Sequence, residues 1–389
     1  MALTSRSRIN SLTSLRFFAA FYVMIFHLEP RWLTLEGSFL LGWTANIIHC
    51  GYISVGFFFI LSGFVLAYNY GEQSHIELDL KKFWIARFSR LYPVFLLGLI
   101  VGFFPALASL QRSDPGAPGI LKLGSYALMN LSLLNAWYYP SSILNYPGWS
   151  LSAEAFFYCI FPFAALKIWE IRRPRLIGFM VFIATLSVLI PLIAFWLRPD
   201  LSFGSDTFLA DLIGNNPLIR STEFLLGIAA GRFFLTRPSS EDRPYGWLVF
   251  SLIIFCFVVV SFSPFIPGLL LRNGLLDLPF LGIIYFSAKD KGRWARMLSF
   301  GPLLLLGESS YALYILHVPF RDLNLAFIRK FDFAARLASS VWFFVFIAGI
   351  IPVSIAVYLK VEEPARKWLK QRLSSRRIEC PVVNAEVGI

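Results

Sequence analysis

Uninterrupted apolar runs of about twenty residues recur along the whole chain and restrict the folds it can adopt. Clear examples are residues 51–70, 176–197 and 340–359. A helix needs about 20 apolar residues to cross ~30 Å of hydrocarbon, and these runs do not alternate as the strands of a membrane barrel do. Because 57% of the residues are hydrophobic and only 15% are charged, the sequence predicts an all-α integral membrane protein.

The chain has eleven candidate spans, one of which is more polar than the others. They lie at residues 15–34, 51–70, 91–110, 120–137, 150–168, 176–197, 219–235, 246–263, 267–287, 299–320 and 339–359. Residues 120–137 are interrupted by Lys122, Asn130 and Asn135, whose side chains are costly in hydrocarbon. We therefore predict about ten transmembrane helices, with residues 120–137 as a re-entrant or interfacial segment.

Basic residues are concentrated in short segments between the apolar runs. If residues 120–137 do not cross the membrane and the amino terminus is cytosolic, these segments face the cytosol, as the positive-inside rule requires. They are residues 81–90, 172–175, 237–243 and 289–296 and the tail after Lys360. The outward loop 321–338 is the exception, because it also carries basic residues. We predict a multi-pass protein of the cytoplasmic (inner) membrane with both termini in the cytosol.

One membrane domain accounts for most of the chain. There is no strong internal repeat or low-complexity tract, so we predict a membrane domain at residues 1–366 and a basic cytosolic tail at 367–389. The cytosolic basic segments explain the net charge of +12, and no nucleic-acid partner is expected. The amino terminus has no small-residue cleavage signal, which indicates that it is retained.

The spacings that mark several common catalytic and metal sites are absent from the sequence. The four cysteines have no CxxC spacing, and the four histidines lack the spacing of metal ligands. There is no Walker loop, GxSxG or HExxH motif. Ser310 and His317 are seven residues apart on one helix, about 10 Å, which is too far for a nucleophile and its base. We expect no metal and no tightly bound cofactor.

Two ionisable residues share the first span. Arg16 and His27 are eleven residues apart, so they lie on the same helix face, about 16 Å apart along the axis. The predicted orientation places Arg16 near the cytosol and His27 in the outer half of the membrane. Such residues are candidates for function because they are costly in lipid. Arg16 could instead be an interfacial anchor, and His27 could make a hydrogen bond that packs helices.

Two later spans carry further candidates. Glu154 begins the span that descends from the outer side, where a carboxylate can also stabilise a helix amino terminus. His317 lies toward the outer end of the span at residues 299–320. We therefore predict that His27, Glu154 and His317 lie at similar depth on three separate helices.

The basic segment at residues 81–90 holds a second pair of arginines. Arg87 and Arg90 are three residues apart on the cytosolic side, like Arg16. Guanidinium groups bind phosphate well, although a basic segment at the membrane surface would have the same composition. These arginines lie on the cytosolic side, and His27, Glu154 and His317 lie toward the outer side. The two groups together predict a site that is reached from both sides of the membrane.

Six motifs along the chain resemble those of the membrane-bound acyltransferase 3 family, whose members commonly O-acylate bacterial surface and exported glycans. The motifs are residues 14–16 with His27, GFFFILSGF at 56–64, RFSRLYP at 87–93, WSLSAE at 149–154, GESSY at 307–311 with His317, and EEPAR at 362–366. Their order and spread over nearly all of the chain make the resemblance specific. The family has a ten-helix core, which agrees with the span count.

The resemblance implies a membrane O-acyltransferase that uses acyl-coenzyme A as donor. The histidine of the family's first span is essential and its arginine motifs are important, roles that carry over to His27, Arg16, Arg87 and Arg90. The expected acyl group is acetyl, and the expected acceptor is a hydroxyl of a carbohydrate or glycolipid. Members with an additional secreted hydrolase-like domain are not matched, so we expect transfer within the membrane domain or delivery to a partner.

The expected chemistry needs a general base for the acceptor hydroxyl, and the pKa of histidine suits this task. We predict that His27 is this base and that Glu154 or His317 orients it, and the sequence leaves the choice open. Arg16, Arg87 and Arg90 would bind the phosphates of coenzyme A. Further site candidates from the motifs are Trp149, Ser150, Ser309, Ser310 and Tyr311.

A multi-helix transporter of a polar or glycan-related solute is the alternative hypothesis, because ionisable residues in spans also mark transport pathways. A transporter of this kind often has two related halves, which the sequence does not show.

Overall fold

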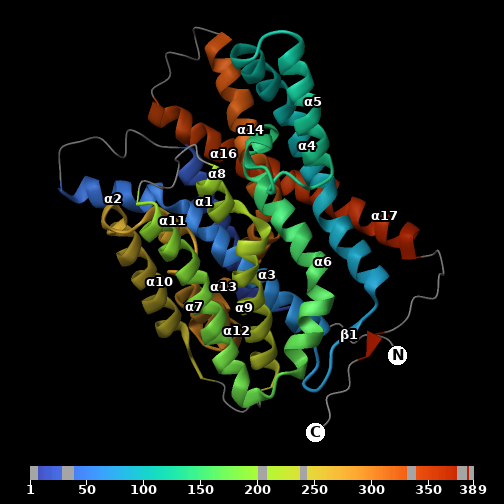
Figure 1. Cartoon of the computed structure of the whole chain (residues 1–389), viewed down its shortest axis with the longest axis vertical. Helices are drawn as coiled ribbons and strands as arrows, with labels where there is room; N and C mark the ends of the chain where they lie inside the picture. Colours follow the sequence, from blue (N-terminus) through green and yellow to red (C-terminus); the bar gives the residue numbers. More distant parts are fainter. Residues whose placement is uncertain are drawn as a thin grey trace.

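The computed structural model describes residues 8–28, 39–199, 208–236, 243–330, 339–374 and 383–384. Helices dominate these residues, as Figure 1 shows, which confirms the predicted all-α class. In chain order the elements are α1 (Asn10–Leu28), α2 (Phe39–His49), η2 (Gly51–Ile53), α3 (Ser54–Tyr70), β1 (Glu77–Leu78), α4 (Leu80–Ser113), α5 (Ala117–Leu131), η3 (Tyr139–Leu144), α6 (Gly148–Glu170), α7 (Arg173–Leu197), α8 (Phe208–Asn215), α9 (Pro217–Leu235), α10 (Gly246–Ser261), η4 (Ser263–Phe265), α11 (Gly268–Arg272), α12 (Asp277–Lys289), α13 (Arg293–Leu298), α14 (Gly301–Lys330), α16 (Ser339–Val357), η5 (Tyr358–Glu362), α17 (Glu363–Ser374) and β2 (Val383–Asn384).

Eight helical segments within the described residues are long and apolar enough to cross a membrane. They are Asn10–Leu28, Gly42–Tyr70, Leu80–Ser113, Gly148–Glu170, Arg173–Leu197, Gly268–Lys289, Gly301–Ile328 and Ser340–Leu369. Two shorter or more charged helices, α9 and α10, cover the other two predicted spans. The membrane class is therefore confirmed, and ten is an approximate count of the crossings.

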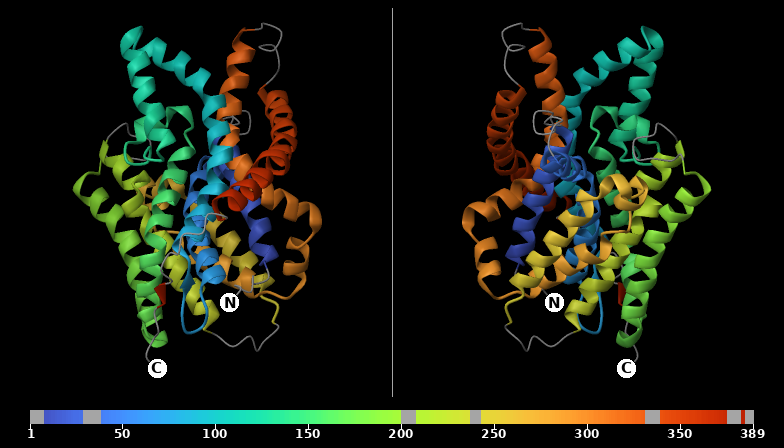
Figure 2. Two further views of the ribbon diagram at one scale, coloured as in Figure 1. Left: turned by 90° about the vertical axis from the view of Figure 1, so that its right-hand side faces the viewer. Right: turned by 90° about the vertical axis from the view of Figure 1, so that its left-hand side faces the viewer.

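Residues 120–137, predicted not to cross, form α5 and the turn after it. At fifteen residues α5 is about 22 Å long, which is short of the ~30 Å hydrocarbon layer. The two asparagines of the segment are buried against protein: Asn130 donates to the Ser141 carbonyl (2.7 Å), and Asn135 donates to the Ser142 hydroxyl (3.2 Å). Figure 2 shows α4 and α5 as a hairpin that rises at one end of the bundle.

The helices α3 and α9 form the closest helix pair in the centre of the bundle. Their backbones approach so closely at Gly227 that an added Cβ would lie 2.1 Å from the Ile60 carbonyl oxygen. Small residues permit such contacts between membrane helices. The two helices run in the same direction, because Gly56 meets Glu223 while Ala67 meets Gly231 nearer their carboxyl ends.

One predicted span end differs from the structure. The span expected to end at residue 320 continues as α14 to Lys330, so part of the predicted loop 321–338 is helical. The division into a membrane domain and a tail at residue 366 stays a prediction, and α17 covers Glu363–Ser374 around that position. Of the tail beyond α17, the structure describes only β2, which pairs antiparallel with β1. Helices continue into polar sequence because their backbone hydrogen bonds are local and do not require an apolar environment.

Candidate active site

A cavity with a volume of about 570 Å³ opens where α1, α4 and α14 begin and where α3 ends. We call it the mouth. Its lining includes the three predicted donor-binding residues Arg16, Arg87 and Arg90. In all, five arginines and three glutamates line it, so positive charge is in excess. Such a cavity suits a polyanionic group.

A narrower cavity of about 100 Å³ continues from the mouth into the bundle, and we call it the chamber. Arg16, Arg87 and Arg90 line both cavities and therefore mark their junction. The chamber ends beside Ser150 and Tyr314. A ligand whose anionic part remains among the arginines can thus extend its neutral part into the chamber.

The first turns of α4 position two of the arginines. Arg87 donates a hydrogen bond to the Tyr70 hydroxyl (3.3 Å), and its guanidinium carbon is 5.7 to 5.9 Å from the centroids of the Tyr70, Phe83 and Tyr158 rings. Stacking of this kind orients a guanidinium group without neutralising it. Arg90, one turn later, lies on the same face and reaches the same junction.

Arg16 and Arg90 have no hydrogen bond or ion pair with any part of the chain that the structure describes. Both are partly buried. Partly buried charges are normally paired, because desolvation without compensation is costly. The two guanidinium groups at the wall of the cavity are therefore available to an anionic ligand.

Glu154 lies in the chamber with the arginines, not with the histidines. Its carboxylate accepts a hydrogen bond from the Ser62 hydroxyl (3.2 Å) and a short one from the Tyr158 hydroxyl. No hydrogen bond within the described residues joins it to His27 or His317. This differs from the predicted arrangement, because the face of α6 that carries Glu154 and Tyr158 is turned toward α3 and α4.

The two predicted histidines are in direct contact. His317 Nε2 is 3.1 Å from His27 Nδ1, although 290 residues separate them. Helices α1 and α14 run side by side in the same direction, which brings residue 27 of α1 level with residue 317 of α14. Arg321 donates to the backbone carbonyl of His27 and forms an ion pair with Asp322 (2.7 Å). One basic residue of the loop that was the exception to the positive-inside rule is therefore paired.

Hydrogen bonding assigns the tautomers of this pair. His317 Nδ1 is 3.1 Å from the Leu313 carbonyl, which requires a proton on Nδ1 and leaves Nε2 as an acceptor. His27 Nδ1 must then be the donor to His317 Nε2, and it also lies 3.0 Å from the Val23 carbonyl. The unprotonated atom of His27 is consequently Nε2, which is the atom a general base requires.

The remaining candidates connect the chamber with the histidine pair. The hydroxyls of Ser150 and Tyr314 are 2.8 Å apart, and the Tyr314 ring centroid is 6.1 Å from that of His317. Ser309 and Ser310 bond to carbonyls in their own helix, and the Tyr311 hydroxyl donates to the Leu91 carbonyl (2.6 Å). Ser310 and Tyr311 also line the chamber, whereas Ser309 lines neither the mouth nor the chamber.

Comparison with known families gives the assignment. The acyltransferase 3 family, described as an acyltransferase domain, matches residues 9–359, which is nearly the whole chain. The chain belongs to the acyltransferase 3 family. Comparison with solved structures gives no match.

Relatives in this family include two O-acetyltransferases. The chain is 27% identical to the peptidoglycan O-acetyltransferase OatA of Listeria monocytogenes, over 81% of this chain and 50% of the relative. It is 25% identical to the O-acetyltransferase OatA of Staphylococcus aureus, over 96% of this chain and 57% of the relative. It therefore spans about half the length of these relatives. The acyltransferase MdmB of Streptomyces mycarofaciens is 27% identical, over 80% of this chain and 78% of the relative.

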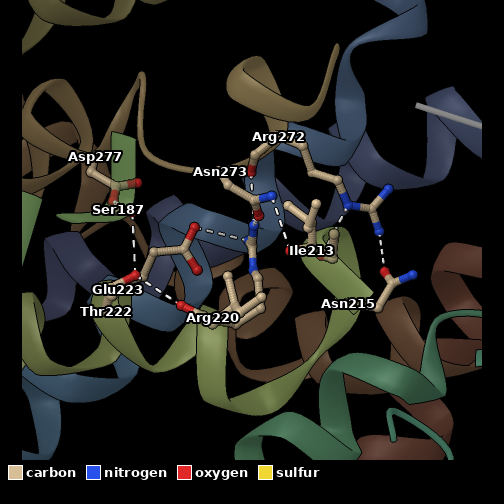
Figure 3. Close-up of polar contacts among 11 residues, drawn as sticks. Ser187, Ile213, Asn215, Arg220, Thr222, Glu223, Arg272, Asn273 and Asp277 are labelled. Atoms are coloured by element: carbon tan, nitrogen blue, oxygen red, sulfur yellow. Dashed lines mark hydrogen bonds and ion pairs between the residues drawn. The ribbon is translucent and has the colours of Figure 1, made fainter. Parts of the chain in front are cut away.

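This member of the acyltransferase 3 family also has a buried charge cluster that our sequence analysis did not single out (Figure 3). Arg220 and Glu223, one turn apart on α9, form an ion pair of 3.0 Å with side chains only 1% and 2% exposed. Asp277 accepts from the Ser187 hydroxyl (2.7 Å) nearby. This cluster could have been found from the sequence, because its charged residues lie inside the predicted spans 219–235 and 267–287.

The cluster surrounds a break in the span expected at residues 267–287. Here α11 ends at Arg272 and α12 begins at Asp277, with Gly274 at a φ of +90°. Arg220 donates to the Arg272 carbonyl (2.8 Å), which the break leaves without a helical partner, and to the Asn273 side chain. Irregular backbone at membrane depth needs such protein partners.

Removing Glu223 should therefore destabilise the fold. In Glu223→Ala the buried Arg220 loses its counter-charge, and we expect the free energy of unfolding to fall by about 3–5 kcal/mol. Thermal unfolding of the detergent-purified protein measures this change. Glu170→Ala is the control, because Glu170 pairs with Lys167 through side chains that are 54% and 79% exposed, and its loss should hardly matter. Equal stability of the two variants would contradict a structural role for the buried pair.

Proposed function

We propose that this protein is a membrane O-acyltransferase that moves an acyl group, with acetyl as the first candidate, from cytosolic acyl-coenzyme A to a hydroxyl of a carbohydrate acceptor on the outer side. The observation that carries the proposal is the pair of unpartnered guanidinium groups, Arg16 and Arg90, at the entrance of a cavity that leads into the bundle. Family membership and the relatives named O-acetyltransferases support acyl transfer to a glycan.

The mouth would bind the phosphates of coenzyme A. Arg16, Arg87 and Arg90 converge on the junction between mouth and chamber, where arginine forks can engage phosphate oxygens. The glutamates of the mouth do not cancel this charge, since they are fewer and Glu308 is already paired with Arg8. The thioester end of the uncharged pantetheine arm would then enter the chamber and point toward Tyr314.

His27 would act as the general base. Its Nε2 takes the proton of the acceptor hydroxyl while the hydroxyl oxygen attacks the thioester carbonyl, forming a carbon–oxygen bond. The carbon–sulfur bond breaks, and the departing thiolate receives the proton back from the imidazolium of His27. His317 positions the base by accepting from its Nδ1, as the third group of a catalytic triad orients its histidine.

The sequence predicted that Glu154 or His317 orients His27, and this mechanism gives Glu154 a different role. Because it accepts from Tyr158, whose ring faces Arg87, it holds the wall of the chamber and balances the arginine charge. Its carboxylate therefore positions the donor-binding residues and does not orient the imidazole.

Reconstituted vesicles test the proposal. Labelled acetyl-coenzyme A is supplied on the side of the mouth, and soluble peptidoglycan fragments and neutral oligosaccharides are supplied on the other side. We expect label in a saccharide only when both substrates are present on these opposite sides. Absence of both acyl transfer and acyl-coenzyme A binding, with movement of a labelled saccharide across the bilayer, would replace the proposal with the transporter hypothesis.

A further inference from the structure

A second large cavity lies at the other end of the bundle from the mouth, and none of the predicted site residues lines it. The mouth touches the carboxyl end of α3 at Asn69, whereas this cavity touches Asn216 at the amino end of α9, the helix that runs parallel to α3. Its volume is about 590 Å³, within the range of 300–1,000 Å³ typical of small-molecule sites. We call it the outer pocket.

Aromatic side chains form one wall of the outer pocket. Trp137, Tyr138, Tyr139 and Tyr146 all line it, and they come from a single segment between α5 and α6. Trp137 and Tyr146 are 37% and 39% exposed, so their rings are accessible. Such rings offer flat apolar surface with a polar edge, which suits the alternating carbon–hydrogen faces and hydroxyl edges of a sugar ring.

Polar groups that are fixed in place also line the outer pocket. Arg272 donates to the Gly214 carbonyl (3.1 Å) and to the Asn215 side chain, and Asn215 donates to Asp211 (3.3 Å). The Asn216 side-chain oxygen caps α9 by accepting from Leu218 N (2.9 Å). Carboxylate, amide and guanidinium groups therefore line the pocket in positions that hydrogen bonds within the chain fix, and groups fixed in this way bind hydroxyls with little reorganisation.

The charge of the outer pocket distinguishes its ligand from that of the mouth. One carboxylate, Asp211, and one guanidinium, Arg272, line it, so the charges balance. The mouth has an excess of arginine. A neutral, hydroxyl-rich ligand fits the outer pocket, whereas a polyphosphate fits the mouth.

The wall of the outer pocket is tied to the helix that carries His317. The Asn145 amide, directly after η3, donates to the Ile315 carbonyl (3.1 Å), two residues before His317. On the other side the Arg272 guanidinium carbon is 5.2 Å from the centroid of Trp149, the neighbour of Ser150 at the end of the chamber. The pocket therefore adjoins the region where chamber and histidine pair meet.

We propose that the outer pocket is the binding site for the saccharide acceptor, with the sugar ring stacked on Trp137 or Tyr146. This inference rests on the proposed acyl transfer for its role, but the binding itself does not require it. The aromatic residues could alternatively serve as an interfacial belt, which would anchor the protein without binding a sugar. If the pocket binds a sugar, saccharide binding depends on the aromatic residues that line it and not on exposed aromatic residues elsewhere.

Equilibrium binding of labelled chitotetraose and cellotetraose to the purified protein tests this site. We expect Trp137→Ala and Tyr146→Ala each to weaken binding by about tenfold, with acetyl-coenzyme A binding unchanged. Trp196→Ala is the matched control, because Trp196 lies near the carboxyl end of α7, is 78% exposed and does not line the outer pocket. Trp137→Phe, which retains a ring, should restore most of the affinity and guards against misfolding of the alanine variant.

The outcomes separate this inference from the proposed function. Three outcomes would overturn the outer pocket as the acceptor site. They are unchanged saccharide binding in both pocket variants, an equal loss of binding in Trp196→Ala, and no binding of either saccharide by the intact protein. Labelled acetyl transfer, measured in parallel, reports on the function itself. Transfer with pocket-independent binding would refute only the site, whereas pocket-dependent binding without transfer would refute only the enzyme activity.

Discussion

His27→Gln is expected to reduce acyl transfer by about 10²–10⁴-fold, the usual contribution of a general base, while acetyl-coenzyme A still binds normally. The glutamine side chain can keep a hydrogen bond to His317 but cannot take a proton from the acceptor. Donor binding should survive because His27 lies away from the mouth, about 16 Å along α1 from Arg16. Single-turnover transfer and equilibrium binding of the donor measure the two effects separately.

His49→Gln is the control for this prediction, since His49 is exposed at the end of α2 and lines neither mouth nor chamber. His317→Gln should have a smaller effect than His27→Gln and should change the pH profile of transfer, because it alters the partner of the base but not the base itself. Full transfer by His27→Gln would remove His27 from the mechanism. A His317→Gln defect without any change in pH profile would indicate a packing role.

The second large effect is expected at the mouth. Arg16→Gln and Arg90→Gln should each weaken acetyl-coenzyme A binding by roughly 10- to 100-fold, since a hydrogen bond between charged groups contributes about 1.5–3 kcal/mol. Neither arginine has a protein partner within the described residues, so the loss should fall on the ligand and leave folding intact. The donor KM should rise, with transfer at saturating donor less affected.

Salt dependence provides an independent measure of the same contacts. Binding by the intact protein should weaken as ionic strength rises, and the dependence should be shallower in the arginine variants. Arg175→Gln is the matched control, because Arg175 is an exposed arginine at the start of α7 and lies outside the mouth. Loss of affinity in Arg175→Gln equal to that in Arg90→Gln would mean that general surface charge attracts the donor.

The membrane class and the approximate spans could be predicted because the length of an apolar run is a local property. The same holds for residues 120–137, whose polar residues argued against a lipid-facing span. Of these residues, Asn130 and Asn135 are buried against the segment that follows. The predicted ends of the helices were less accurate than their positions. Helix α14 continues ten residues past the expected position, because helical hydrogen bonds do not depend on hydropathy.

The candidate site could be predicted only in part. The depth argument placed His27 and His317 at the same level, and the structure brings them into contact. The same argument grouped Glu154 with them, but the rotation of α6 turns this carboxylate toward the arginines. Arg220 and Glu223 lie in a predicted span and carried the same signal, yet nothing in the sequence shows that Arg220 meets the carbonyl of Arg272.

The sequence by itself determined that this is a helical membrane protein of the acyltransferase 3 type, with arginines near one surface and a histidine deeper in its first span. Only the tertiary structure decided which of these residues share a cavity, how His27 and His317 are hydrogen-bonded, and where a second pocket lies. The physical reason is that hydropathy and helix depth depend on neighbouring residues. Contacts such as that between residues 27 and 317 depend instead on how whole helices pack and rotate against one another.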